Sequence, residues 1–403
     1  MKAARNSRTW IYAAAMSLLA STASPAADRL RILGNGTELG ETPIVASIPA
    51  KLAPGVYRLS VEGRQPIRAS VFREGDENRI ALVLPGLGAR EAIDFAIEPA
   101  PGSAEPVGIR LTETTDAVHV ALDGKAFTRH LSAAAPKPFL HPLIGPTGEP
   151  FTRAFPMLDI PGEKRDHPHQ RSFWFTHGKV NGIDFWSEMK GHGSIKETSR
   201  KIMSAGPVMA ELRTTDDWLG PDGKKILDDE RTIRFYATTT ARIVDFSIVL
   251  RAGKDPVVFG DTKEGMFGVR VATSMDVTSK QGGKITNAEG LTDDKAWGKA
   301  SPWVDYTGPV AGKTVGIAIL DHPSSFRHPT TWHVRTYGLF AANPFGWKDF
   351  GRPDKGDHTI APGESIRFAY RVVLHTGDTE SARPAAAFAG FAVPPKVDLV
   401  SGE

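Results

Sequence analysis

The sequence predicts an all-β protein in which a small β-sandwich precedes a much larger antiparallel two-sheet sandwich. Short apolar runs alternate with polar residues almost to the end of the chain, as in half-buried antiparallel strands. The 40 glycines and 30 prolines interrupt these runs, and such frequent turns suit many short strands better than long helices. No stretch with helical periodicity extends beyond a few turns.

The first 27 residues have the order of a signal peptide. Lys2, Arg5 and Arg8 form a basic region. The apolar stretch from Trp10 to Ala20 is too short to span a membrane stably, and small residues suited to cleavage follow at 24–27. We therefore expect a periplasmic or secreted protein without stable membrane insertion; an uncleaved anchor is the alternative.

The net charge narrows the class of binding partner, and the absence of cysteine narrows the chemistry. The formal net charge is +3 at pH 7, and the signal segment holds three basic residues and no acid, so the chain after it is formally neutral. Such a chain has no electrostatic reason to bind nucleic acid or an anionic membrane. A small-molecule or oligosaccharide substrate is the expected partner. Without cysteine, disulfides and thiolate chemistry are excluded.

Two folding units are expected after the signal segment. Residues 28–104 form the predicted small β-sandwich domain, with strand-like runs at 44–46, 57–61, 67–72 and 80–84. The proline-rich segment Pro99–Pro106 is the predicted linker. Residues 105–395 form the predicted large domain, with strand-like runs at 118–122, 231–236, 242–250, 315–320 and 365–374. So many strands need two packed sheets, because a single twisted sheet rarely grows so wide.

The densest group of titratable residues lies at Asp166–Arg171. On extended backbone His167, His169 and Arg171 share one face, which favours a catalytic or binding row over a loop that only caps turns. His-x-His is also a metal-ligand spacing, and His177 is a possible third ligand. We predict no cofactor and keep a metal at these three histidines as an alternative.

Two further segments carry candidate residues. Asp321-His322-Pro323 repeats the Asp-His-Pro order of residues 166–168, although proline could simply fix a turn there. Beyond it, His333, Arg335 and Tyr337 would share one face of a strand. Lys263, Glu264 and Arg270 border an apolar run and suggest either an acid/base pair or an ion-pair network. Trp303 is a candidate platform for a sugar ring, although tryptophan is more often buried.

Taken together, these segments closely resemble the bacterial domain-of-unknown-function family labelled "methane oxygenase PmoA-like", over about residues 110–380. The resemblance is carried by Lys137–Phe139, Asp166–Arg171, Lys263–Gly265, Trp303–Tyr306, Asp321–Pro323, Trp332–Arg335 and Asn343–Gly346. Gln170 stands where the family pattern leads us to expect a second consecutive histidine. The resemblance implies a galactose-mutarotase-like β-supersandwich, similar to carbohydrate-active enzymes, while the label itself suggests a metal-dependent oxygenase or hydrolase.

The sequence therefore predicts a periplasmic carbohydrate-processing protein that uses acid/base chemistry on a sugar or sugar derivative, as a hydrolase, lyase or epimerase. Glu264 is the candidate general base, and His167 or His333 the general acid. The predicted catalytic residues are His167, His169, Glu264 and His333. The predicted substrate-binding residues are Arg171, His177, Lys263, Arg270, His322, Arg335, Tyr337 and Trp303.

We expect eight of these side chains to line a single cleft, because each would lack polar partners if it were buried alone. They are His167, His169, Arg171, Lys263, Glu264, His322, His333 and Arg335. The alternatives are a non-catalytic glycan-binding protein and the metal-dependent oxygenase or hydrolase that the family label suggests.

Overall fold

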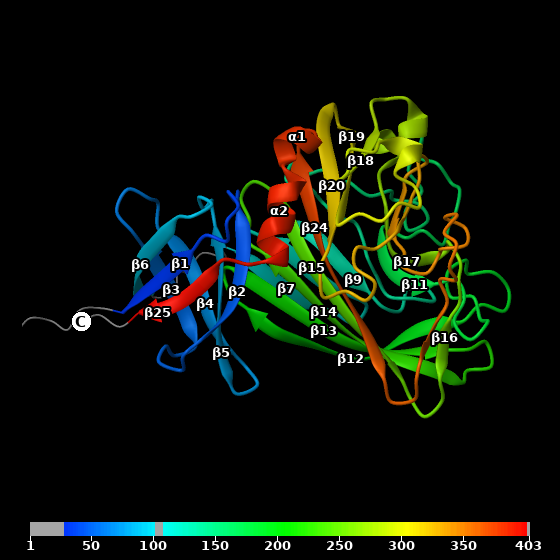
Figure 1. Cartoon of the computed structure of the whole chain (residues 1–403), viewed down its shortest axis with the longest axis horizontal. Coiled ribbons are helices and arrows are strands. Elements are labelled where there is room, and N and C mark those ends of the chain that lie inside the picture. Colours follow the sequence, from blue (N-terminus) through cyan, green and yellow to red (C-terminus); the bar gives the residue numbers. More distant parts are fainter. Residues whose placement is uncertain (1–27, 101–107, 401–403) are drawn as a thin grey trace, which may run out of the picture.

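The computed structural model describes residues 28–100 and 108–400 of the chain (Figure 1). The predicted signal segment and residues 101–107 of the predicted linker lie outside the described residues. The regular secondary structure of the described part is nearly all strand, and every pair of neighbouring strands is antiparallel. The predicted all-β class is confirmed.

Two eight-stranded sheets face each other and form the large sandwich. The sheet that carries the candidate site, here called the site sheet, runs in the order β21-β22-β17-β11-β10-β9-β8-β7. Its strands are β7 (Ile109–Glu113), β8 (Val118–Leu122), β9 (Lys125–Leu131), β10 (Phe139–Leu140), β11 (Phe173–His177), β17 (Gly265–Arg270), β21 (Trp332–Val334) and β22 (Leu339–Ala342).

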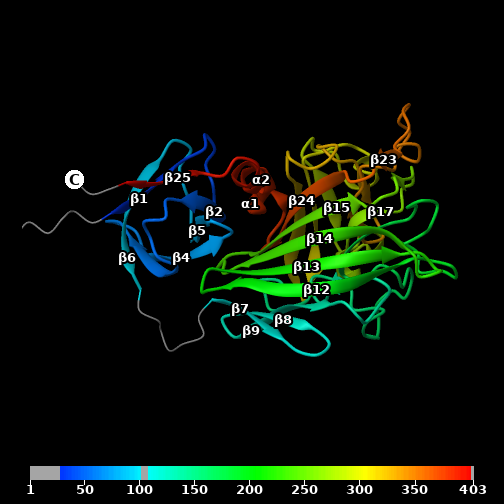
Figure 2. The same ribbon diagram turned by 90° about the horizontal axis from the view of Figure 1, so that it is seen from below.

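The second sheet, here called the back sheet, has longer strands in the order β12-β13-β14-β15-β24-β20-β19-β18 (Figure 2). Its strands are β12 (Ser194–Ala205), β13 (Met209–Leu219), β14 (Lys225–Tyr236), β15 (Arg242–Ala252), β18 (Lys284–Asn287), β19 (Trp303–Val310), β20 (Lys313–Asp321) and β24 (Ser365–Thr376). The short strands β16 (Val257–Phe259) and β23 (His358–Ile360) pair with each other as a separate two-stranded sheet, and their buried residues join the core of the sandwich.

Aromatic rings fill the space between the two sheets. Phe173 and Phe175 of β11 contact Phe246 of β15, with ring centroids 5.7 and 5.9 Å apart. Phe267 of β17 stacks on Tyr370 of β24 at 4.6 Å. These residues occupy alternate strand positions, so the opposite positions of the site sheet point away from the core. That outer face carries the candidate site.

Seven strands form a third sheet, the N-terminal sheet, in the order β2-β5-β4-β3-β6-β1-β25. Its strands are β1 (Arg29–Leu33), β2 (Thr42–Ile48), β3 (Gly55–Ser60), β4 (Ile67–Glu74), β5 (Glu77–Leu84), β6 (Ala92–Pro99) and β25 (Lys396–Val400). The sheet rolls around one apolar core so that β2 also packs against β25.

The N-terminal sheet differs in two ways from the small β-sandwich predicted within residues 28–104. It is one rolled sheet, and its last strand comes from the other end of the chain. β25 pairs with β1 over five residue pairs from Arg29↔Val400 to Leu33↔Lys396. Val397 and Leu399 of β25 pack on the apolar core of this sheet, so pairing with β1 also removes apolar surface from water.

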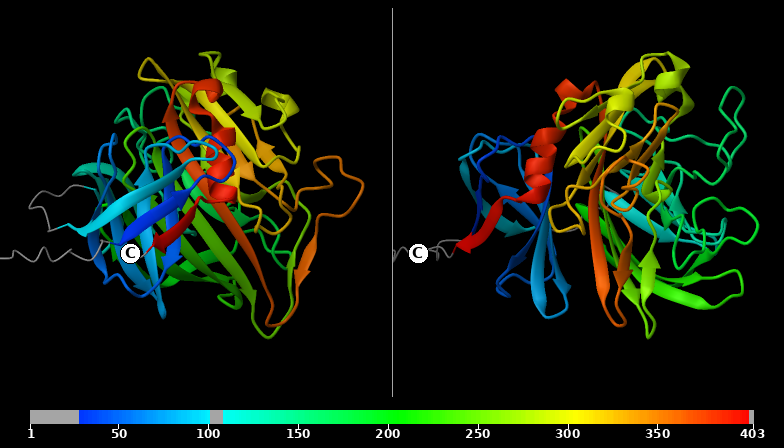
Figure 3. Two further views of the ribbon diagram at one scale, coloured as in Figure 1. Left: turned by 60° about the vertical axis from the view of Figure 1, so that its left-hand side comes forward. Right: turned by 45° about the vertical axis from the view of Figure 1, so that its right-hand side comes forward.

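The N-terminal sheet packs on the outer face of the back sheet, beside helix α2 (Pro384–Ala392), which lies between the two units in Figure 1. The short helix α1 (Thr379–Ala382) precedes α2. Three 3-10 turns complete the described elements: η1 (Thr273–Met275), η2 (Val277–Ser279) and η3 (Asp293–Lys295). Figure 3 shows α2 beside the strands of both units.

Candidate functional site

Two buried arginines hold the loop that carries Asp166 and His167. Arg153, which is 1% exposed, donates to Oδ1 of Asp166 at 2.7 Å and to the carbonyl oxygen of His167 at 3.0 Å. Arg270 of β17 donates to the two Asp166 oxygens at 2.9 and 3.0 Å, and also to Oε1 of Gln170. Burial alone would raise the pKa of Asp166, but the Arg270 charge and hydrogen bonds from His167 and Arg270 lower it to about 2. Asp166 is therefore a fixed carboxylate anion.

Asp166 orients the ring of His167. Nδ1 of His167 lies 2.6 Å from Oδ2 of Asp166, and an ionised carboxylate can only accept, so Nδ1 carries the proton and donates it. This leaves Nε2 of the neutral ring as an acceptor with no protein partner among the described residues. The side chain of His167 is 42% exposed, and its ring stacks on Tyr337 at 5.0 Å and 8°. An oriented, accessible imidazole of this kind has the geometry of a general base.

The backbone around His167 is not the extended strand that the sequence predicted. His167 has a φ of 45°, and the N–H of Gln170 donates to its carbonyl oxygen at 3.0 Å, closing a turn. His167, His169 and Arg171 therefore do not share a strand face. The left-handed conformation is uncommon for a residue with a Cβ, and here the hydrogen bonds to Arg153 and Asp166 fix it.

His333 lies on β21 with its ring on the outer face, opposite the core residues Trp332 and Val334. The indole N–H of Trp297 donates to its Nδ1 at 2.9 Å, so the proton of the neutral ring sits on Nε2. Burial, followed by the charges of Arg335 and Lys263, lowers the pKa of His333 to about 3. The prediction of His333 as a general acid is therefore wrong near neutral pH: its imidazole is neutral and can donate a hydrogen bond through Nε2.

Arg335 and Tyr337 lie on the turn between β21 and β22, since the predicted strand ends at residue 334. The N–H of Gly338 donates to the carbonyl of Arg335 at 3.0 Å and closes this turn. The guanidinium of Arg335 lies 5.5 Å from the Trp297 ring and 5.8 Å from the Tyr337 ring. It forms no ion pair with the described residues, and its buried Nε has no hydrogen-bond partner there. Arg335 is thus a cation held between aromatic rings and available to an anion.

Lys263 and Glu264 form an ion pair where the chain enters β17. Nζ of Lys263 lies 3.1 Å from Oε1 of Glu264, and both side chains are partly exposed. The Lys263 charge helps to lower the pKa of His333, after burial and Arg335. Burial raises the pKa of Tyr337, and the Glu264 charge adds to this. The pair therefore lies at the edge of the site, and the role of Glu264 as general base stays a prediction.

A continuous set of contacts joins these groups on the outer face of the site sheet. We call it the His167–His333 cluster, and its members in order of contact are Asp166, His167, Tyr337, Arg335, Trp297 and His333. His169 adjoins it, with its ring 5.7 Å from His167. Burial and the charge of Lys137 lower the pKa of His169 to about 4, so its ring is neutral near pH 7.

Two predicted substrate-binding arginines are already occupied by protein groups. Arg171 donates to both oxygens of Glu188, at 3.1 and 2.8 Å, and buried Lys137 binds the same carboxylate. Arg270 is buried and uses its guanidinium on Asp166 and Gln170. Arg270 therefore acts on the site by fixing Asp166, and neither guanidinium presents a free fork to a substrate.

His177 is placed away from the cluster in the apolar interior. Its ring packs against Phe259 and Phe345 at 5.5 and 5.2 Å, and its Nε2 donates to the carbonyl of Gly260 at 2.8 Å. The possible metal set of His167, His169 and His177 is therefore not assembled. In residues 28–100 and 108–400, no group of three His, Cys, Asp or Glu side chains is placed to hold a metal ion.

The single-cleft prediction is wrong for His322, and Trp303 is also far from the cluster. The His322 ring lies 4.9 Å from Phe391, beside a cavity on the outer face of the back sheet. Trp303 is buried in the apolar contact between the back sheet, α2 and the N-terminal sheet. The topology explains both positions. Trp303 begins β19 and His322 directly follows β20, and both strands belong to the back sheet, whereas His333 belongs to the site sheet.

Two residues that orient the histidines were not among the predicted site residues. Asp166 stands directly before His167, and a carboxylate beside a histidine is a visible sequence signal. Trp297 precedes His333 by 36 residues, and nothing in the local sequence connects the two.

The fold and cluster define a class: an all-β, two-sheet protein with an oriented histidine and an unpaired arginine on the outer face of one sheet. Within that class, the chain belongs to a family of unknown function, DUF6807, whose model matches residues 117–389. This confirms the predicted domain of unknown function; the "methane oxygenase PmoA-like" label stays a prediction. No match to a curated protein sequence was found.

Three solved structures are similar at 9% identity. A glycosyl hydrolase family 38 protein from Enterococcus faecalis has a TM-score of 0.47, with 93% of this chain and 48% of that one covered. The α-galactosidase from Lactobacillus brevis has a TM-score of 0.31, with 83% and 41% covered. A galactose mutarotase related enzyme from Lactobacillus acidophilus also has a TM-score of 0.31, with 66% and 97% covered.

This chain spans less than half the length of the first two of these proteins. At such identities and TM-scores the likeness says nothing of function, which must come from the side chains of the site. Among the described helices, none combines the length and the apolar character that a bilayer crossing requires.

Proposed function

We propose that this chain is an exported carbohydrate-processing enzyme that transfers protons on a sugar acid. The observation that supports the proposal is the position of His167, oriented by Asp166, in one cluster with the unpaired Arg335. A base that can take up a proton and a cation that can hold a carboxylate are the two groups that proton abstraction beside a carboxylate requires.

His167 is the proposed base, and its Nε2 takes the proton from the carbon next to the substrate carboxylate. The electron pair of the broken C–H bond moves into the carboxylate, which becomes an enediolate. Arg335 and the Nε2–H of His333 donate hydrogen bonds where this negative charge develops. Return of a proton to the carbon gives exchange or epimerisation, whereas loss of a group from the neighbouring carbon gives an elimination. The products are those of an epimerase or a lyase.

The arrangement favours these reactions over glycoside hydrolysis. Hydrolysis of a glycoside generally uses two carboxyl groups, one of which must keep its proton near neutral pH. In the cluster Asp166 has a pKa of about 2 and is fixed by two arginines. At the edge Glu264 pairs with Lys263. Asp166 is therefore not available as a protonated acid, and Glu264 is paired with a cation.

The test is solvent deuterium exchange followed by proton NMR. Uronic and aldonic acids, and oligosaccharides that contain them, are incubated with the protein in D2O beside the matching neutral sugars. We expect loss of the signal from the C–H next to the carboxylate, or an unsaturated product, with the sugar acids alone. The H167A variant should lack this activity, and the H322A variant should keep it because His322 lies outside the cluster.

Two outcomes would overturn the proposal. Saturable binding of a sugar acid without exchange or turnover would favour the non-catalytic glycan-binding protein. Activity that disappears with a chelator and returns with a metal ion would favour the metal-dependent oxygenase or hydrolase.

The exported location is proposed from the order of residues 1–27 alone. Sequencing of the N-terminus of protein from the periplasm or medium should give a start at about residue 27 or 28. A mature protein that still begins at Met1 would contradict this.

A further inference from the structure

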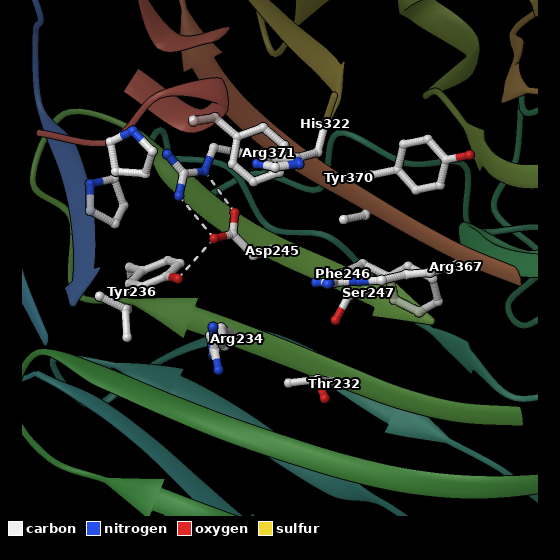
Figure 4. Close-up of a pocket in the computed structure, with 15 residues that line it drawn as sticks. Thr232, Arg234, Tyr236, Asp245, Phe246, Ser247, His322, Arg367, Tyr370 and Arg371 are labelled. Carbon is white, nitrogen blue, oxygen red and sulfur yellow. Dashed lines mark hydrogen bonds and ion pairs between the residues drawn. The ribbon is translucent and has the colours of Figure 1, made fainter. Parts of the chain in front are cut away.

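A cavity lies on the outer face of the back sheet, away from the His167–His333 cluster, where the N-terminal sheet meets the back sheet. It measures about 190 Å³, and its wall includes Pro43 and Val45 of β2, Phe391 of α2 and His322 (Figure 4). Three separate parts of the fold therefore enclose it. Binding sites occur preferentially where such units meet.

Small side chains form the floor of this cavity. Thr232, Ser247 and Ala369 are paired in register across β14, β15 and β24, so they stand side by side on the outer face of the back sheet. The hydroxyl groups of Thr232 and Ser247 have no hydrogen-bond partner among the described residues. Both hydroxyls can therefore donate to or accept from a ligand.

One wall of the cavity is a rigid, charge-neutralised network. Arg371 donates to both oxygens of Asp245 at 2.7 and 2.8 Å. The hydroxyl of Tyr236 donates to the same carboxylate at 2.8 Å. Arg234 is likewise engaged, since its Nε donates to Glu211 at 2.5 Å. Figure 4 shows Tyr236, Asp245 and Arg371 joined on one side of the cavity.

The facing side of the cavity carries a cation without a partner. Arg367 of β24 is exposed and forms no ion pair or hydrogen bond through its guanidinium with the described residues. Figure 4 shows it beside Ser247, on the side away from Asp245. Its charge acts on His322, whose pKa is lowered by burial first and by Arg367 second. The cavity thus combines one free guanidinium, two free hydroxyls and an aromatic ring, Phe391.

We propose that this cavity binds a small hydroxylated carboxylate of the size of one sugar acid. The fork of Arg367 matches a carboxylate, the hydroxyls of Thr232 and Ser247 match ring hydroxyls, and Phe391 offers an apolar face to the C–H side of a ring. At about 190 Å³ the cavity is smaller than the roughly 300–1,000 Å³ of pockets for drug-sized ligands, which limits its ligand to about one ring. The site is independent of the function proposed for the His167–His333 cluster.

Isothermal titration calorimetry with D-glucuronate, and with D-glucose as its neutral match, tests the proposal. We expect glucuronate to bind at least about tenfold more tightly than glucose. R367A should lose at least about tenfold in affinity, R367K should lose less because it keeps the charge, and S247A should weaken binding. The matched control is R110A, which removes an exposed arginine on β7 that forms no ion pair with the described residues.

The R335A variant, in the His167–His333 cluster, distinguishes binding in the cavity from binding at the cluster. If the cluster also holds glucuronate, the wild-type protein will show two sites, one lost in R335A and the other lost in R367A. Loss of all glucuronate binding in R335A alone would overturn the cavity proposal while leaving the cluster intact. Affinity of R367A and S247A equal to that of R110A would also overturn it, as would the absence of saturable binding in the wild-type protein.

Discussion

The two Asp-His-Pro segments of this chain have the same residues and different structures. In the first, the Asp166 carboxylate lies 2.6 Å from the ring of the adjacent His167. In the second, Asp321 accepts from the ring of His328 at 2.8 Å and from the N–H of Thr330 at 2.9 Å. The ring of His322 turns instead to the hydroxyl of Ser324, at 2.8 Å.

The difference comes from the surroundings of each aspartate. Asp166 lies between Arg153 and Arg270, and the positive φ of His167 turns its ring back to the carboxylate. Asp321 is fully buried at the end of β20, where it satisfies a loop N–H and the ring of His328. The first carboxylate thus orients a histidine that reaches solvent, and the second fixes a turn. The motif alone does not determine which role results.

Substitution of the histidine in each Asp-His-Pro segment should give the largest difference in activity between the two segments. H167A removes the proposed base, so we expect proton exchange on the sugar acid to slow by about 10²–10⁴-fold. H322A removes a ring outside the cluster and should change the rate less than about twofold, since no interaction with the cluster is broken. Exchange rates from proton NMR at one pH check both. Equal losses in the two variants would mean that His167 has no special role.

Substitution of the aspartate in each segment should give opposite results: D166N should lower the rate of exchange, whereas D321N should lower the stability of the fold. D166N takes away the charge that holds Nδ1–H of His167, so we expect at least about a tenfold loss of rate. D321N weakens hydrogen bonds to His328 and Thr330 in a fully buried place. It should lower the free energy of unfolding by about 1–3 kcal/mol and leave the rate nearly unchanged.

Urea unfolding and exchange rates, measured on both variants, check this contrast. A D321N protein that folds as stably as the wild type but loses activity would show that the second segment also serves the reaction.

Local patterns were enough to predict the strands but not their partners. The run predicted from Arg242 to Leu250 is the strand β15, Arg242–Ala252, because side-chain alternation is a property of neighbouring residues. The pairing of β25 with β1 joins residues 396–400 to residues 29–33. Such a contact depends on how the whole chain packs, and its five residues carry no mark of their partner.

The site was predictable in its residue types and less so in their roles. The sequence pattern, in which titratable residues recur near prolines and aromatics, led us to expect His167, His333 and Arg335 in one place. The structure brings these three residues and Tyr337 into one cluster. Whether an arginine is free depends on a carboxylate elsewhere in the chain. Arg171 is taken by Glu188, whereas Arg335 has no such partner in the described part of the chain.

A smaller effect is expected at Trp297, which sets the tautomer of His333. W297F removes the N–H that donates to Nδ1 at 2.9 Å, so both tautomers of His333 become possible and Nε2 no longer always carries the proton. We expect about a tenfold loss of rate or less, because only one of the hydrogen-bond donors to the developing charge is affected. The proton shifts of His333 in NMR spectra should show the mixture. An unchanged tautomer with an unchanged rate would rule out this role.

The pH response of the buried histidines differs from that of an exposed ring. Burial lowers the pKa of His333 to about 3 and that of His177 to about 4, from an ordinary value of 6.5. Below pH 6.5 the unfolded chain therefore binds protons that the folded chain does not, so stability is lost as the pH falls from 6.5 toward 4. Each such group contributes a slope of at most about 1.4 kcal/mol per pH unit.

The H333Q variant should flatten the loss of unfolding free energy between pH 6.5 and 4, and H322A should flatten it less, since His322 is less buried. Chemical unfolding at a series of pH values measures the slopes. A wild-type stability that rises as the pH falls through this window would contradict a neutral, buried His333, and with it the role of that ring as a hydrogen-bond donor.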